Sequence, residues 1–185
     1  LGLVGSEMCI RDRYILDLTP YFEQYPEWKE GVQDFAWETT QFDGIEGTYG
    51  IPWSAYQLCL YYNKDYLDQV GVDVPESWDD LVDACAKLKD AGITPMTMDD
   101  AYATCVIGYH LARLVGEDKV KEIVTEGKWD DPAVLQMAQD IEELASNGYY
   151  SEMVGSNVWP AGQNTELALG TAAMYLNCLL YTSPS

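Results

Sequence analysis

Between residues 64 and 177 the apolar positions recur at helical spacing in several segments. The clearest stripe lies in segment 78–90 and consists of Trp78, Leu81, Val82, Cys85 and Leu88. Ser77 stands directly before this stripe as an N-cap residue, and Asp80 stands three residues later, where a capping-box acid accepts from the N-cap amide. Gly92 follows the segment. This pattern predicts a helix over Trp78–Asp90.

Other segments carry the start and stop signals of helices. Gly71 and Gly148 are suitable residues to end helices, and Pro132 is suited to a first helical position. Helices are therefore expected over Glu27–Phe35, Lys64–Val70, Ala101–Leu114, Lys119–Thr125, Pro132–Asn147 and Thr165–Leu169.

Four further segments have extended character: Thr48–Trp53, Gln57–Asn63, Ile93–Met98 and Ala172–Leu176. Within the second, Leu58–Tyr62 is almost continuously apolar, which favours a strand buried on both faces. Strands separated by helical segments indicate an α/β fold with a largely parallel sheet.

The composition and charge of the chain argue against several classes of function. The 185 residues include 10 Lys or Arg and 31 Asp or Glu, for a formal charge of −21. Binding to nucleic acid or to an anionic membrane surface is not expected, because both require clustered basic residues. The single histidine excludes a site with several histidine ligands. No apolar run approaches the roughly 20 residues that cross a membrane as a helix.

The two ends of the chain have an unusual relationship. Coding sequences for Glu7–Arg13 and for Cys178–Ser185 can be written as reverse complements of each other, and this DNA resembles a transposase adapter used for sequencing libraries. A native amphipathic N-terminus with a Ser/Pro tail is the alternative. We expect residues 1–13 and 178–185 to be adapter-derived rather than native.

Motifs for chemistry are absent from the sequence. It contains no dinucleotide-binding, phosphate-binding, HExxH, EF-hand or GxSxG pattern. His110 lies within an expected helix, which favours a structural role. The remaining cysteines, Cys59, Cys85 and Cys105, form no CxxC pair and are expected to be small buried residues. We therefore expect neither an enzyme nor a cofactor or metal site.

Aromatic residues are frequent outside the expected helices. Flat rings pack against the C–H face of a sugar, and carboxylates and amides bind its hydroxyl groups. For Tyr61, Trp78 and Tyr109 core packing is the better interpretation. A core position and a site position remain open for Trp53, Tyr56, Tyr102 and Trp159.

Four motifs in order resemble the family 1 extracellular solute-binding proteins of ABC importers. They are DLTPYFEQ (Asp17–Gln24), YGIPWSAYQLCLYYNKDYLDQVGV (Tyr49–Val72), PESWDDLVDACAKLKDAGITPM (Pro75–Met96) and ALGTAAMYLN (Ala168–Asn177). The resemblance spans Tyr14–Asn177. Two departures are Thr171, where the family usually has Lys or Glu, and segment Ser156–Asn164, which has no obvious counterpart.

The resemblance implies a periplasmic-binding-protein-like fold of two α/β lobes, incomplete here. Residues 14–57 would be part of lobe one, 58–63 a hinge strand that crosses between lobes, and 64–177 most of lobe two. The hinge would include Tyr61, Tyr62 and Asn63. The resemblance places Trp53, Ser54, Tyr56, Gln57, Asp100 and Tyr102 in the ligand cleft, and the aromatic pattern adds Trp159.

The implied function is capture of a sugar or oligosaccharide in the cleft and its delivery to the transmembrane permease of an ABC importer. The implied location is extracytoplasmic, either periplasmic or as a lipoprotein at the outer face of the cytoplasmic membrane. A polyamine or other cation is an alternative ligand, since the negative chain would steer positive ligands inward. An acid-pair glycoside hydrolase is the third hypothesis and the least favoured.

Overall fold

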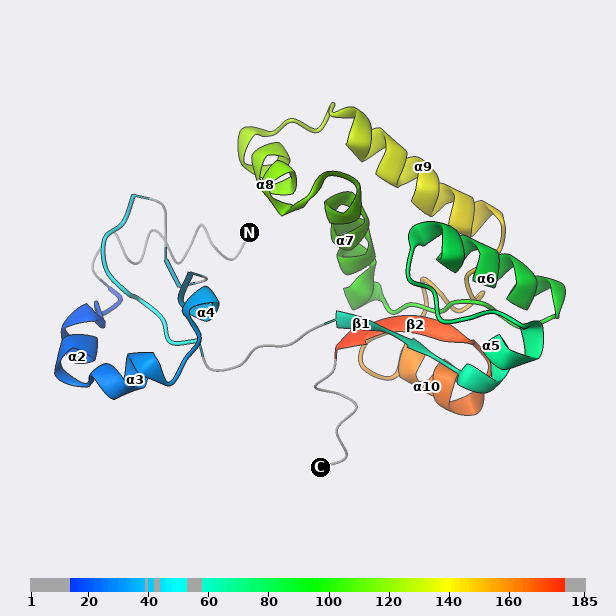
Figure 1. The fold of residues 1–185 in the computed structure, drawn as a ribbon, viewed down its shortest axis with the longest axis horizontal. Coiled ribbons are helices and arrows are strands. Elements are labelled where there is room, and N and C mark those ends of the chain that lie inside the picture. Colours follow the sequence, from blue (N-terminus) through cyan, green and yellow to red (C-terminus); the bar gives the residue numbers. More distant parts are fainter. Residues whose placement is uncertain (1–13, 39, 42–43, 53–57, 179–185) are drawn as a thin grey trace. The chain divides into compact units, whose positions relative to one another are not determined.

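The computed structural model describes residues 14–38, 40–41, 44–52 and 58–178 (Figure 1). Its internal contacts divide the chain into two compact units, Leu1–Gln57 and Leu58–Ser185. Each unit is described by itself. Apart from Cys178, both predicted adapter segments lie outside the described residues.

The described residues of the first unit contain three short helices, α2 (Thr19–Gln24), α3 (Pro26–Glu30) and α4 (Asp34–Glu38). The single helix predicted over Glu27–Phe35 is therefore wrong. Pro26 occupies the start of α3 and Gly31 is its C-cap, so the first helix ends before α4 begins. Phe22 and Trp37 form the buried contact of this unit, edge to face with ring centroids 5.0 Å apart.

Asp17 ties two segments of the first unit together. Its carboxylate accepts hydrogen bonds from the amides of Thr19, at 2.9 Å, and Thr48, at 3.1 Å. These hydrogen bonds lower the pKa of Asp17. The amide of Leu18 in turn donates to the carbonyl of Thr48 at 2.8 Å. The expected extended segment that starts at Thr48 forms no strand in its described part, residues 48–52.

Two antiparallel strands run through the second unit, β1 (Leu58–Tyr62) and β2 (Met174–Cys178). The prediction of a largely parallel sheet is wrong for this pair, because the chain runs along β1 at the start of the unit and returns along β2 at its end. Among the described residues, parallel pairing is limited to isolated bridges that Met96 forms with Met174 and Tyr150. The predicted strand Ile93–Met98 is reduced to these bridges.

The helices of the second unit follow the local sequence signals closely. They are α5 (Lys64–Val70), α6 (Trp78–Asp90), the 3₁₀ turn η1 (Asp100–Tyr102), α7 (Ala103–Val115), α8 (Glu117–Glu126), α9 (Pro132–Ser146) and α10 (Gly162–Leu169). Both bonds of the capping box predicted for Ser77 and Asp80 are present. No helix within the described ranges is long and apolar enough to cross a membrane.

Two apolar clusters hold the second unit together. The larger one includes Leu67, Leu88, Leu144 and Met174, from α5, α6, α9 and β2. The smaller one joins α7, α8 and α9 through Leu111, Ile123 and Met137. In Figure 1, α6 and α9 lie on one side of the two strands and α10 on the other.

Three burial predictions have different outcomes. β1 is half-buried rather than buried on both faces. Tyr109 is 49% exposed and is not a core residue, because the neighbouring His110 and Leu111 occupy the inward face of α7. His110 has the expected structural role: its Nε2 lies 2.6 Å from Oδ2 of Asp140, and its ring stacks on Trp78 at 3.7 Å.

Candidate functional site

The candidate site lies where the extended segment 94–99 meets η1. Asp100 begins this turn, and the loop formed by residues 151–161 lies beside it. The amide of Asp100 donates to the carbonyl of Asn157 at 3.3 Å. The amide of Trp159 donates to Oδ1 of Asp100 at 3.2 Å. The structure thereby brings together two predicted site residues, the exposed Asp100 and Trp159, a tryptophan that is 41% exposed.

Asp99 precedes this carboxylate but is only 1% exposed. Its Oδ1 accepts from the amide of Gln163 at 2.6 Å, and its own amide donates to Oε1 of Gln163 at 3.1 Å. Burial raises the pKa of Asp99, and the charges of Asp100 and Glu166 raise it further against the lowering effect of the Gln163 bond. Oδ2 of Asp99 is buried without a hydrogen-bond partner among the described residues.

Gln163 also connects the start of α10 to β2. Its Nε2 donates to the carbonyl of Leu176 at 3.0 Å. Next to it in sequence, Gly162 has no room for a side chain: a Cβ there would lie 2.5 Å from Oδ1 of Asp99 and 2.6 Å from Cβ of Asn157. A glycine is therefore required for α10 to approach the site this closely.

Glu166, one turn further along α10, accepts hydrogen bonds from three side chains. Ser151 Oγ donates to Oε1 at 2.5 Å, and Asn157 Nδ2 donates to Oε2 at 2.6 Å. The hydroxyl of Thr97 also donates to Oε2. A carboxylate has only acceptor sites, so it satisfies three converging donors at once.

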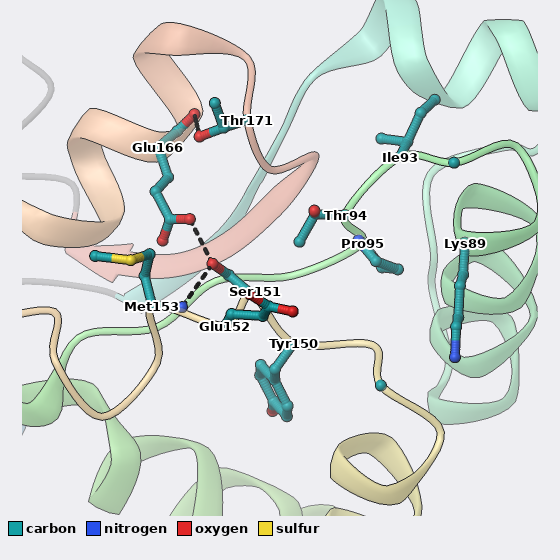
Figure 2. A pocket seen from close by; sticks show the side chains of 12 residues that line it. Lys89, Ile93, Thr94, Pro95, Tyr150, Ser151, Glu152, Met153, Glu166 and Thr171 are labelled. Carbon is teal, nitrogen blue, oxygen red and sulfur yellow. Dashed lines mark hydrogen bonds between the residues drawn. The ribbon is translucent and has the colours of Figure 1, made fainter.

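Figure 2 shows the hollow on one side of this carboxylate, a cavity of about 500 Å³. Tyr150, Ser151, Glu166 and Lys89 are among its lining residues. A second hollow of about 360 Å³ has Asn157, Val158 and Glu166 among its lining residues. Neither set of lining residues includes Asp100 or Trp159, so both hollows lie beside the predicted site rather than in it.

The other predicted site residues have varied positions. Tyr102 is 7% exposed, so its ring is packed inside and not presented on the surface of the described part. Tyr61 stacks on Tyr175 across the β1–β2 pair, with ring centroids 5.4 Å apart. Tyr62 ends β1 and is partly exposed, and Asn63 caps α5 by accepting from the amide of Asp65. Trp53, Ser54, Tyr56 and Gln57 lie outside the described residues.

Asn177 adds an amide near the end of β2. Its Nδ2 donates to Oδ1 of Asn164 at 2.6 Å and lies 3.4 Å from the hydroxyl of Tyr175. Within the ranges that the structure describes, no group of three or more His, Cys, Asp or Glu side chains could hold a metal ion. The groups assembled here suit hydrogen bonding and ring stacking with a polar ligand.

The sequence did not predict the residues whose hydrogen bonds hold the elements of this site together: Asp99, Asn157, Gln163 and Glu166. One signal was available, because segment Ser156–Asn164 stood out as having no counterpart in the motif pattern. That segment contains Asn157 and Gln163, together with Gly162, the position where a side chain does not fit.

Both the sequence and the structure of this chain are similar to those of known solute-binding proteins. The sequence profile of a family described as "Bacterial extracellular solute-binding protein" matches residues 10–177. A solved chitin oligosaccharide binding protein is 30% identical, with a TM-score of 0.73 over 89% of this chain and 41% of that chain.

Two further relatives are named for sugars or sugar-like ligands. The GacH receptor of Streptomyces glaucescens, solved unliganded and with acarbose, is 28% identical, with a TM-score of 0.58 over 79% of this chain and 36% of that one. The multiple sugar-binding protein of Streptococcus mutans is 31% identical over 67 residues, which are 36% of this chain and 16% of that protein. The chain thus spans about two fifths of the length of these solved structures.

Proposed function

Since the chain belongs to the family of bacterial extracellular solute-binding proteins, we propose that the complete protein captures a sugar or oligosaccharide and delivers it to an ABC permease. Its fold is part of the two-lobe α/β fold of periplasmic binding proteins, as the sequence predicted. We assign residues 14–57 to lobe one, 58–63 to the hinge and 64–177 to lobe two.

One observation carries the choice of ligand: the exposed residue Asp100 accepts a hydrogen bond from the backbone amide of Trp159, a tryptophan that is itself 41% exposed. The carboxylate accepts hydrogen bonds from sugar hydroxyls, and the indole face packs against the C–H groups of the ring. Tyr102 is buried, so in this proposal its ring packs inside the protein and does not contact the sugar. Chitin oligosaccharide and multiple-sugar binding by the relatives support the same ligand class.

The place of action follows from the family. Its members are described as extracellular, and we assign this protein to the periplasm or to a lipid anchor at the outer face of the cytoplasmic membrane. A permease is the partner that an extracytoplasmic receptor of this kind requires for uptake.

Saturation-transfer NMR on the 185-residue chain tests the ligand class, because it detects weak contacts made by one wall of a site. The probes are chitotriose, raffinose and the polyamine spermidine. We expect saturation transfer to a saccharide, lost in Trp159→Ala and reduced in Asp100→Asn. Trp129→Ala is the matched control, since Trp129 is also an exposed tryptophan, 59% accessible, on the loop between α8 and α9.

The outcomes separate the two ligand classes. A saccharide signal that survives Trp159→Ala, or falls equally in Trp129→Ala, contradicts this location of the site. A signal from spermidine alone, lost in Asp100→Asn and in high salt, would replace the sugar by a cation, which the charge of −21 would attract.

A further inference from the structure

The 151–161 loop, which carries Trp159, has little apolar packing to hold it. Met153 and Val158 are 52% and 64% exposed. Many of its backbone bonds are internal turns, such as those from the amides of Ala161 and Gly162 to the carbonyl of Val158. A loop with few buried apolar contacts keeps one conformation only if polar contacts fix it to the body of the protein.

Those polar contacts converge on Glu166. Ser151 at the start of the loop and Asn157 in its second half both donate to this carboxylate, at 2.5 and 2.6 Å. Thr97 donates to the same carboxylate and accepts from Asn157 Nδ2 at 3.1 Å. Figure 2 shows Ser151 Oγ between Glu166 and the amide of Met153, to which it is also hydrogen-bonded.

A continuous path leads from Glu166 to the proposed ligand-binding residues. Asn157 is held by its side chain, and its carbonyl accepts from the amide of Asp100 at 3.3 Å. Asp100 then accepts from the amide of Trp159 at 3.2 Å. Each step is a hydrogen bond, so removing the Glu166 carboxylate releases the Asn157 side chain and weakens the hold on the loop that carries Trp159.

We propose that Glu166 is a positioning residue: its carboxylate anchors the 151–161 loop and so holds Trp159 beside Asp100 for ligand binding. The ligand role rests on the proposed function, whereas the anchoring does not. Because Glu166 accepts from three donors, the requirement is for acceptors at this point and not for negative charge as such.

Three variants of the 185-residue chain test this proposal. Glu166→Ala removes all acceptors. Glu166→Gln keeps one oxygen for Asn157 and Thr97, and its amide can donate to Ser151 Oγ, since a hydroxyl can reverse its role. Glu152→Ala is the matched control, because Glu152 is exposed and lies in the loop itself, and its replacement removes the same charge.

Amide hydrogen exchange resolved by NMR is the first readout. In Glu166→Ala the amides of Asn157 and Trp159 should exchange about tenfold faster or more, because bonds to a charged acceptor are lost. The amides of Cys85 and Leu88 in the core should keep their rates, which excludes global destabilisation. Glu166→Gln and Glu152→Ala should both resemble the parent chain.

Saturation transfer from the chain to chitotriose is the second readout, and it should fall in Glu166→Ala and return in Glu166→Gln. Unchanged exchange at Trp159 in Glu166→Ala would overturn the proposal. Faster exchange without any loss of saccharide contact would also overturn it. If the parent chain contacts no saccharide, the proposed function fails while the exchange data still decide whether Glu166 anchors the loop.

Discussion

Gly162 and Gly108 provide two chemically identical substitutions for which the structure predicts opposite effects. Both glycines lie in helices, Gly162 at the start of α10 and Gly108 within α7. Replacing a helical glycine by alanine normally stabilises, because alanine loses less backbone entropy on folding. A Cβ added at Gly108 would point into open space, with no neighbour within 4 Å, so Gly108→Ala should stabilise by about 0.5–1 kcal/mol.

The environment of Gly162 reverses the sign. An added Cβ would lie 2.5 Å from Oδ1 of Asp99 and 2.6 Å from Cβ of Asn157, well inside van der Waals contact. Neither neighbour can move alone, because Asp99 is bonded to Gln163 and Asn157 to Glu166. Overpacking of this kind costs about 1–3 kcal/mol, and the loss of one hydrogen bond adds about 1 kcal/mol.

The helical advantage of alanine, about 1 kcal/mol, offsets only part of that cost. Gly162→Ala should therefore lower the free energy of unfolding by a net amount of about 1–3 kcal/mol. Urea unfolding followed by far-UV circular dichroism measures both variants against the parent, with equal m-values as the condition for comparison. A Gly162→Ala variant as stable as Gly108→Ala would refute the tight packing of α10 on Asp99 and Asn157.

Three further predictions test individual groups. Ser77→Ala removes the hydroxyl that caps α6 and should lower the free energy of unfolding in urea by about 1 kcal/mol; an unchanged midpoint would contradict the cap. Burial raises the pKa of the Cys85 thiol to about 12. Iodoacetamide at pH 8 should therefore modify Cys85 only after unfolding, and well after it modifies the half-buried Cys105; mass spectrometry detects both modifications. The raised pKa of Asp99 lets the folded chain hold a proton that the unfolded chain releases, so stability should fall as pH rises from about 4. Thermal unfolding should show a weaker fall in Asp99→Asn, and an equal fall in the variant and the parent would contradict the raised pKa of Asp99.

The sequence predicted the helices of the second unit well because their signals are local. Ser77 and Asp80 are three residues apart, and each determines the start of α6 through bonds to backbone close in sequence. Gly71 ends α5 in the left-handed conformation for a similar reason. Such interactions need no knowledge of the rest of the fold.

The sheet was predicted less well because strand direction depends on distant partners. The apolar run Leu58–Tyr62 identified β1, but nothing within it showed that β2 would pair with it in the opposite direction. Ile93–Met98 has the composition of a strand, yet only Met96 forms bridges. The burial of β1 was overestimated for the same reason, since a residue pattern does not show which faces are covered.

The candidate site shows the same division between local and distant information. Family resemblance and the aromatic pattern selected Asp100 and Trp159 separately, and their contact spans 59 positions of sequence. The bond between Glu166 and Thr97 spans 69 positions. A glutamate on a short helix is ordinarily a solvent-exposed residue, so its role as a shared acceptor could not be predicted from its position in the chain.

Two consecutive aspartates show how this fold separates support from recognition. Asp99 has extended backbone, with φ −91° and ψ 159°, and successive side chains in extended backbone point to opposite sides. Asp99 therefore turns inward to bind Gln163 at the start of α10, and Asp100 turns outward beside Trp159. Because of this alternation, Asp99→Asn should change the pH dependence of stability and leave saccharide contact nearly intact. Asp100→Asn should weaken saccharide contact and change the pH dependence less, because burial is the largest cause of the raised pKa of Asp99 and the charge of Asp100 is a smaller one.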